Sequence, residues 1–238
     1  MPRPPSPDPP LPPGFPPQGL AGQATLPLQG LTVLAVEDSR YACEALRLMC
    51  LRAGARLRRA ETLAAARNHL RLYQPDVVII DLGLPDGRGE ALIADLQFAP
   101  RKPAVILGSS GNPEGRSLAL AAGADGFLDK PLESAACFYD TLRQHLPGLQ
   151  AVPPDDRRLV ADPLALQDDL AAAANALSDP AKRPYITAFL LGVAHHAHDS
   201  ALAHAASEAA TSTAGVAPLR ALIAHRLRDT GDAFAETL

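Results

Sequence analysis

Three carboxylates stand at the ends of apolar segments, where they could act together. Glu37 and Asp38 directly follow the apolar segment 31–36, and Asp81 directly follows the apolar segment 77–80. Short, almost purely apolar segments are typical of strands buried on both faces of a parallel sheet. The carboxyl ends of such strands form the edge at which ligands of open α/β sheets bind. Carboxylates gathered there stay ionised together only beside a cation, and a hard, oxygen-liganded ion such as Mg²⁺ suits them.

Two further strand ends add a cation and hydroxyl groups to this edge. Ser109 and Ser110 come shortly after the apolar segment 104–107, and Lys130 follows the short segment 126–128. These are the parts of a phosphoryl-transfer site, in which one carboxylate attacks phosphorus while the metal, an ammonium group and a hydroxyl bind the phosphoryl oxygens. The residues therefore predict Mg²⁺-dependent phosphoryl transfer.

The elements that must position these residues alternate regularly. Strands are expected at 31–36, 55–59, 77–80, 104–107 and 126–128, each followed by a helix. Such alternation predicts a parallel sheet with helices on both faces. Right-handed crossovers and short loops favour a five-stranded, flavodoxin-like, doubly wound α/β fold.

Three segments of this region resemble the receiver domain of two-component response regulators. They are VEDS (36–39), PDVVIIDLGLPDG (75–87) and GADGFLDKP (123–131), and the resemblance covers about residues 30–148. It implies a phosphoprotein of a phosphorelay, which takes its phosphoryl group from a sensor histidine kinase or a histidine phosphotransfer protein. The only catalysis implied is that of the chain's own phosphorylation and dephosphorylation.

The resemblance also implies a role for each residue of the acidic edge. Asp81 matches the phosphoacceptor, which becomes an aspartyl phosphate, and it holds Mg²⁺ together with Glu37 and Asp38. The backbone carbonyl of Gly83 matches a further metal ligand, and Lys130 matches the residue that contacts the phosphoryl group.

The part of the site that transmits the signal matches the family less well. Pro131 matches a proline preceded by a cis peptide bond, and Phe127 matches the switch aromatic. The family's hydroxyl residue, however, falls on Gly108, so that Ser109 or Ser110 supplies the hydroxyl only if the loop is shifted. This departure predicts a weaker switch than is usual for the family.

The predicted domain organisation has four parts: a disordered proline-rich arm (1–28), the receiver domain (29–148), a linker (149–163) and a C-terminal helical domain (164–238). Eleven of the 24 prolines fall in the first 27 residues. The C-terminal part has no β-branched runs, and its large apolar residues recur at helical spacing in four segments. This pattern predicts a small four-helix bundle, which we interpret as a domain for binding a downstream protein or a second copy of the chain.

The charge balance bears on the partners. The chain has 22 basic and 26 acidic residues, and residues 151–238 contain 7 basic and 11 acidic ones. Because a DNA-binding surface needs clustered Lys and Arg, nucleic acid is not expected as a partner, although a DNA-binding transcriptional regulator stays as an alternative.

No apolar run is long enough to span a membrane. The three cysteines lack metal-ligand spacing, which is typical of a reduced, cytoplasmic protein.

The histidines gather in the last third of the chain. His195, His196 and His198 lie close together, but none is followed by the Lys-Gly pair usual in histidine phosphotransfer domains. Solvated surface histidines are the favoured interpretation. A histidine phosphotransfer-like bundle and a transition-metal site at His195, His198 and Asp199 are the two alternatives.

Overall fold

The computed structural model describes residues 26–132, 134–149 and 162–235, with the side chains of the last helix described as far as residue 228. Its strands are β1 (Thr32–Val36), β2 (Arg56–Ala60), β3 (Val77–Asp81), β4 (Gly83–Leu84), β5 (Gly87–Arg88), β6 (Val105–Ser110) and β7 (Gly126–Asp129). Its helices are α1 (Arg40–Ala53), α2 (Leu63–Leu72), α3 (Gly89–Gln97), α4 (Gly115–Ala121), α5 (Ala135–His145), α6 (Pro163–Ala176), α7 (Arg183–His196), α8 (Ser200–Thr211) and α9 (Val216–Ala235), with a short 3₁₀ turn, η1 (Thr213–Gly215).

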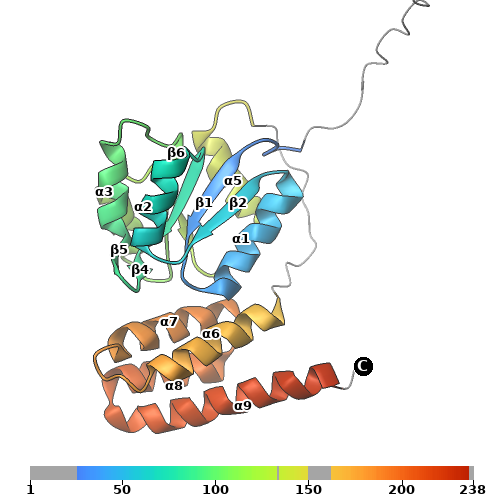
Figure 1. Cartoon of the computed structure of the whole chain (residues 1–238), viewed down its shortest axis with the longest axis vertical. Coiled ribbons are helices and arrows are strands. Elements are labelled where there is room, and N and C mark those ends of the chain that lie inside the picture. Colours follow the sequence, from blue (N-terminus) through green and yellow to red (C-terminus); the bar gives the residue numbers. More distant parts are fainter. Residues whose placement is uncertain (1–25, 133, 150–161, 236–238) are drawn as a thin grey trace, which may run out of the picture.

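The first part of the chain is a parallel sheet with helices on both faces (Figure 1). The sheet has five strands in the order β2-β1-β3-β6-β7, and all of its neighbouring strands are parallel. β4 and β5 form a separate two-stranded antiparallel hairpin after β3. The predicted flavodoxin-like α/β architecture is therefore confirmed for the sheet and its helices.

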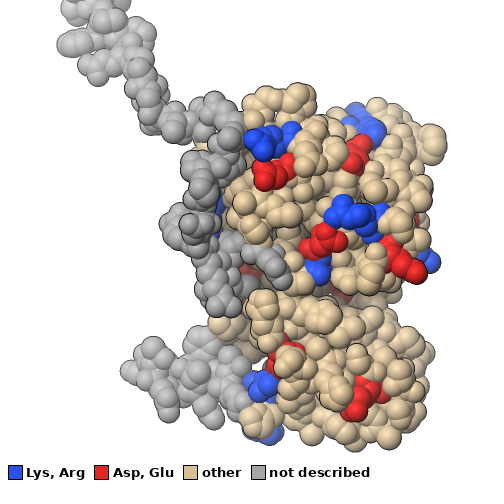
Figure 2. Space-filling model, turned by 180° about the vertical axis from the view of Figure 1, so that it is seen from behind, with Lys and Arg blue, Asp and Glu red and all other residues tan. Residues whose placement is uncertain are grey.

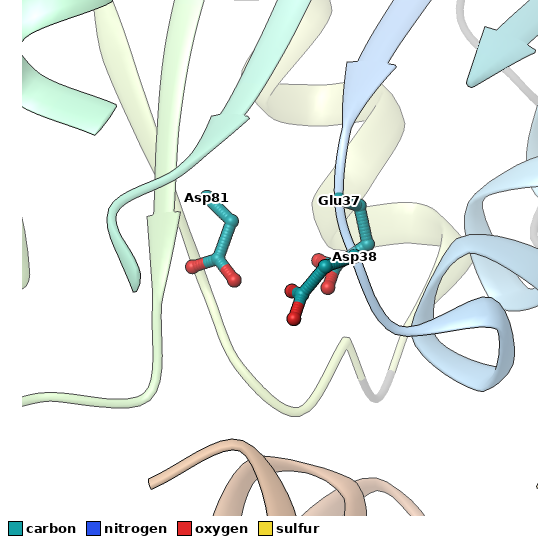
Figure 3. Close-up of side chains that lie close together, drawn as sticks. All are labelled: Glu37, Asp38 and Asp81. Atoms are coloured by element: carbon teal, nitrogen blue, oxygen red, sulfur yellow. The ribbon is translucent and has the colours of Figure 1, made fainter. Parts of the chain in front are cut away.

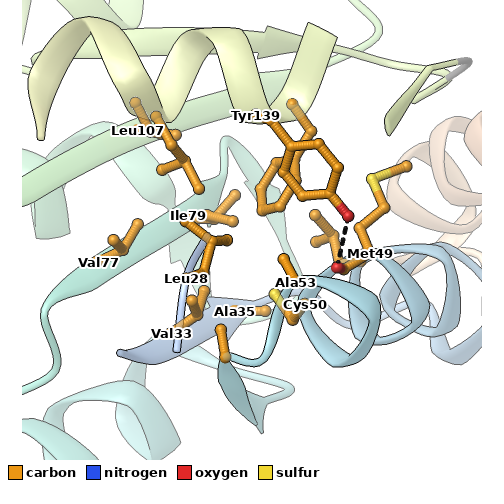
Figure 4. Packing of buried hydrophobic residues seen from close by; sticks show 14 of the residues in the cluster. Leu28, Val33, Ala35, Met49, Cys50, Ala53, Val77, Ile79, Leu107 and Tyr139 are labelled. Carbon is orange, nitrogen blue, oxygen red and sulfur yellow. Dashed lines mark hydrogen bonds between the residues drawn. The ribbon is translucent and has the colours of Figure 1, made fainter. Parts of the chain in front are cut away.

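Two apolar cores flank the sheet because the central strands are buried on both faces. One core joins alternate strand residues to α1 and α5 (Figure 4). Phe138 and Leu142 of α5 are fully buried in this core. In this core the Tyr139 hydroxyl donates a hydrogen bond of 2.8 Å to the carbonyl of Met49, which ties α5 to α1. The other core, with Ile80 and Ile106, packs beneath α2, α3 and α4.

The boundary of the receiver domain lies earlier than the sequence predicts. Residues 1–25 of the predicted arm lie outside the described residues, but Leu28 is only 1 % exposed and belongs to the core beneath α1. Its backbone N–H donates to the carbonyl of Ala53. The proline-rich composition of the preceding residues conceals this apolar anchor, so assigning Leu28 to the arm is wrong.

The C-terminal part is helical, as predicted. Here α6, α7, α8 and α9 share one apolar core, whose most buried members include Leu190, Ala206, Leu219 and Ile223. Asp162 caps α6, and Pro163 occupies the first turn, where a missing N–H costs nothing. Residues 150–161 of the predicted linker and residues 236–238 lie outside the described residues, and the four-helix organisation stays a prediction. We refer to residues 163–235 as the helical region.

No helix in the described part of the chain combines the length and the apolar character needed to cross a membrane.

Candidate functional site

Three carboxylates converge at the carboxyl ends of β1 and β3, as the sequence predicts (Figure 3). Glu37, Asp38 and Asp81 each place an oxygen within 4.8 Å of the other two. β1 and β3 are adjacent parallel strands, with Val36 opposite Ile80, so the residues that follow them must meet at one edge. Glu37 is buried, at 3 % exposed, whereas Asp38 and Asp81 are half-buried.

Lys130 supplies the compensating charge. Its Nζ lies 2.6 Å from Oε2 of Glu37 and 2.9 Å from Oδ2 of Asp81, and its side chain is 10 % exposed. It extends from the turn after β7, where the Lys130–Pro131 peptide bond is cis, as the resemblance implies. Burial opposes the charge of Lys130, but the attraction of Asp81 and Glu37 outweighs burial and raises the pKa of the ammonium group. The cation is therefore fixed between the predicted phosphoacceptor and a predicted metal ligand.

One cation does not neutralise three carboxylates. Burial is the largest effect on Glu37 and, with repulsion from Asp81 and Asp38, it raises the pKa of Glu37 to about 8 against the attraction of Lys130. Burial likewise raises the pKa of Asp38 to about 6, although a hydrogen bond from Tyr185 opposes the shift. The two raised pKa values show that ionising Glu37 and Asp38 together beside Asp81 is unfavourable here, and an additional cation would relieve this repulsion.

This donor set fits Mg²⁺. Carboxylate oxygens on a rigid strand edge are the ligands that a hard divalent ion takes, and the residues present are Glu37, Asp38 and Asp81. Gly83 is placed beside them by β4, and its backbone N–H donates to Oδ1 of Asp81 at 3.3 Å. Its carbonyl as a metal ligand stays a prediction.

Arg59 on β2 holds the acidic segment in place, and sequence reasoning missed it. Its Nε donates to the carbonyl of Glu37 at 2.9 Å, and its second guanidinium nitrogen donates to the carbonyl of Asp38. The only signal in the sequence is an arginine-rich edge strand, in which solvent exposure is the simpler interpretation. Arg59 therefore fixes the backbone on which both carboxylates stand.

The two serines have different surroundings. Ser109 is 2 % exposed, and its hydroxyl donates to the carbonyl of Leu128 at 3.1 Å, inside the fold. Because successive strand residues point to opposite faces, Ser110 lies on the other side and lines the cavity that contains Asp81 and Lys130. The assignment of Ser109 to the site is therefore corrected, whereas Ser110 lines the same cavity as Asp81 and Lys130.

Close packing of α4 explains the glycine at position 108. A Cβ at Gly108 would lie 2.4 Å from the Cβ of Ala119 and 3.2 Å from the ring of Phe127. Phe127 itself is 4 % exposed, with the guanidinium of Arg116 5.2 Å from its ring centre. A side chain at position 108 has no room, so hydroxyl–aromatic coupling must run through Ser110 or be absent.

The helical region contributes residues to this edge, which sequence reasoning did not predict. Asp169 of α6 accepts hydrogen bonds from the Ser39 hydroxyl at 2.7 Å and from the backbone N–H groups of Arg40 and Tyr41 at 2.9 and 3.0 Å. It thereby satisfies unpaired donors at the start of α1. The Tyr185 hydroxyl of α7 donates to the carboxylate of Asp38. Both contacts join parts of the chain more than 120 residues apart.

Two of the C-terminal histidines also face the site. His195 and His196 line the cavity shared with Asp81. Burial, with repulsion from Lys130, lowers the pKa of His196 to about 4, and its Nδ1 hydrogen-bonds to the carbonyl of Gly192 at 3.0 Å. No group of metal-ligand type forms around His195, His198 and Asp199 among the described residues, so the transition-metal alternative is not supported.

Comparisons with known proteins agree with the geometry of this first domain. Residues 33–138 match the sequence profile of the response regulator receiver domain. The KDP operon transcriptional regulatory protein KdpE of Escherichia coli K12 is 37 % identical over 116 residues, which are 48 % of this chain and 52 % of KdpE. The response regulator GtcR of Aneurinibacillus migulanus is 32 % identical over 116 residues, 48 % of each chain. Residues 33–138 are a response regulator receiver domain.

Solved structures match a similar fraction of the chain, about half of it. A putative response regulator from Chloroflexus aurantiacus is 27 % identical with a TM-score of 0.45, covering 48 % of this chain and 95 % of that one. A CheY-like receiver domain from Methylobacillus flagellatus is 26 % identical with a TM-score of 0.45, covering 49 % and 98 %.

The chain spans about half the length of the curated relatives it matches first. Several of these relatives are named transcriptional regulatory proteins, so the prediction that nucleic acid is not a partner finds no support in them. On the face shown in Figure 2, basic and acidic side chains are interspersed.

Proposed function

We propose that this chain is the response regulator of a two-component phosphorelay, which accepts a phosphoryl group on Asp81. The observation that carries the proposal is the ion pair of Lys130 with both Asp81 and Glu37 inside a cluster of three carboxylates. The expected donor is a phosphohistidine of a sensor histidine kinase or of a histidine phosphotransfer protein.

The chain's own residues supply most of the chemistry. An oxygen of Asp81 attacks phosphorus, and the donor's imidazole leaves as the new P–O bond forms. Lys130 already lies 2.9 Å from that carboxylate and is positioned to bind a phosphoryl oxygen, with Ser110 at the same cavity. Mg²⁺, when bound by Glu37, Asp38 and Asp81, neutralises the negative charge that the phosphoryl oxygens bring. Catalysis of this kind is positioning and charge stabilisation, which suits a site on rigid strand ends.

Small phosphodonors give a direct test. With a phosphodonor such as phosphoramidate and Mg²⁺, intact-mass measurement should show the addition of one phosphoryl group per chain. Asp81→Asn should abolish the addition, whereas Asp86→Asn, a carboxylate that caps α2 from outside the cluster, should leave it intact. Equal phosphorylation of the Asp81 variant would overturn the assignment.

We propose that the helical region carries the output by binding a downstream protein or a second copy of the chain. The names of the relatives favour one further candidate, a transcriptional regulator whose output is DNA binding. A gel-shift assay of the full chain against pooled genomic fragments separates the two, since DNA binding by basic groups must weaken as salt rises. Absence of a shift at low salt would exclude the DNA-binding candidate.

A further inference from the structure

Helix α7 lies over the acidic edge and encloses a cavity of about 670 Å³ with it. Asp81 and Lys130 line the receiver side of this cavity, and Tyr185, Gly192 and His196 line the helical side. A cavity of this size accommodates a small molecule, whereas a protein donor would have to bring a folded domain up to Asp81. In this arrangement α7 blocks the approach of a macromolecular donor to Asp81.

Specific polar contacts hold the cover in place. Asp169 accepts three hydrogen bonds from the start of α1, and the Tyr185 hydroxyl donates to Asp38. At the rim, the guanidinium of Arg40 pairs with Asp168 at 2.5 Å. The Asp169 carboxylate is buried, so its removal leaves three donors without their acceptor and costs more than the loss of an exposed ion pair.

The cavity nevertheless reaches the solvent. Gly111, Asn112 and Pro113, which line one end of it, are exposed, as is Arg88, whose side chain is 71 % exposed. The guanidinium of Arg88 pairs with Glu90 at 2.5 Å in this exposed part of the lining. A small anionic donor therefore has a route to Asp81 while α7 stays in place.

Gly192, which lines the cavity from α7, has no side chain to fill it. It lies within α7, where glycine costs about 1 kcal/mol relative to alanine, so helix formation does not explain its presence. A Cβ built on Gly192 has no heavy atom within 4 Å, apart from its chain neighbours and the backbone of its own helix. Tight packing is therefore not the reason for a glycine either. Any larger side chain there would occupy the cavity that Asp81 lines.

We infer that Gly192 is a specificity-determining residue for phosphorylation of Asp81: it leaves room for small phosphodonors beneath α7, while the helix excludes macromolecular ones until the helical region is released. The inference rests on the proposed function and extends it to the choice of donor. With phosphoramidate, an oxygen of Asp81 forms the P–O bond as the P–N bond breaks, and the nitrogen, already protonated in the donor, leaves as ammonia.

The first test fills the cavity. The chain contains no tryptophan, so Gly192→Trp both blocks the cavity and adds a unique fluorophore. We expect phosphorylation of full-length Gly192→Trp by phosphoramidate to be slowed about tenfold, with Gly192→Ala between it and the wild type. Ala201→Trp, at an exposed position on α8, is the matched control and should react like the wild type.

The second test removes the cover. Asp169→Ala, and independently Arg40→Glu, should release the helical region and shift the emission of the Gly192→Trp fluorophore to longer wavelength. Release should restore phosphorylation of Gly192→Trp by phosphoramidate. Chemically phosphorylated poly-L-histidine, freed of phosphoramidate, is the macromolecular donor, and it should react with the released variants about tenfold faster than with the wild type.

The outcomes separate the inference from the proposed function. If wild-type Asp81 takes no phosphoryl group from phosphoramidate, the proposed function fails. If it does, but Gly192→Trp reacts at the wild-type rate, or stays slow although its fluorescence reports release, Gly192 does not control access. Reaction of phosphorylated poly-L-histidine with the wild type as fast as with the released variants would also overturn the inference.

Discussion

At the scale of single residues, Lys130 carries the electrostatics of the site. It is the buried cation that contacts both Glu37 and Asp81, and each of these contacts is shorter than 3 Å. Removing one partner of a buried ion pair leaves an uncompensated charge, which is more costly than losing an exposed pair.

We therefore expect Lys130→Met to lower the free energy of unfolding by about 3 kcal/mol, and added Mg²⁺ to recover part of the loss. Denaturant unfolding with and without Mg²⁺ measures both effects. Lys102→Met, which removes a longer and more exposed pair with Asp125, should change stability by less than about 1 kcal/mol. Equal effects of the two substitutions would show that burial of the Lys130 pairs contributes nothing.

At the scale of elements, α4 approaches β6 so closely that Gly108 has no space for a side chain. The neighbouring Ala119 Cβ would lie 2.4 Å from an added Cβ, a distance at which either α4 or the strand must move. The close packing of α4 against β6 therefore requires glycine at position 108. A residue with the hydroxyl usual for the family does not fit there unless α4 or β6 moves.

Gly108→Thr should consequently destabilise the chain by about 1–3 kcal/mol without making phosphorylation of Asp81 faster. Thermal unfolding and phosphoramidate time courses check the two parts of this prediction. Gly111→Thr is the control for the stability measurement, because its added Cβ meets no atom closer than 3.8 Å. A Gly108→Thr variant as stable as the wild type would show that α4 can move away from β6 at little cost in free energy.

At the scale of the whole molecule, the site is shared between the receiver domain and the helical region. The Tyr185 hydroxyl donates to Asp38, so part of a predicted metal ligand is engaged by α7. A ligand that binds Asp38 must compete with this hydrogen bond or share the carboxylate with it.

Tyr185→Phe should therefore tighten Mg²⁺ binding, by about two- to tenfold for the loss of one competing hydrogen bond. Isothermal titration calorimetry of the full chain gives the affinity. Tyr73→Phe, which removes a hydroxyl contact with His69 away from the acidic edge, should leave the affinity unchanged. Weaker Mg²⁺ binding by Tyr185→Phe would mean that the hydroxyl supports the metal ligand instead of occupying it.

How far the sequence predicts this molecule depends on the range of the interactions. Glu37, Asp38 and Asp81 could be placed together because each ends a buried strand, and strand ends in a parallel sheet share an edge. The partner of Asp38, by contrast, is 147 residues away, on a helix whose apolar spacing indicates only a core face. In the sequence, Asp169 looks like any acidic residue on a helix surface. Only the packing of α6 against α1 shows that its carboxylate caps the start of α1.

The most direct test of the central claim is chemical trapping of the phosphorylated residue. Borohydride reduces an aspartyl phosphate to homoserine, so phosphorylation of the full chain with phosphoramidate and Mg²⁺, followed by reduction and peptide mass spectrometry, locates the acceptor. We expect homoserine at position 81 alone, and its loss when Mg²⁺ is chelated beforehand. Homoserine at another position, or none in a chain that has gained a phosphoryl group, would contradict the assignment of Asp81.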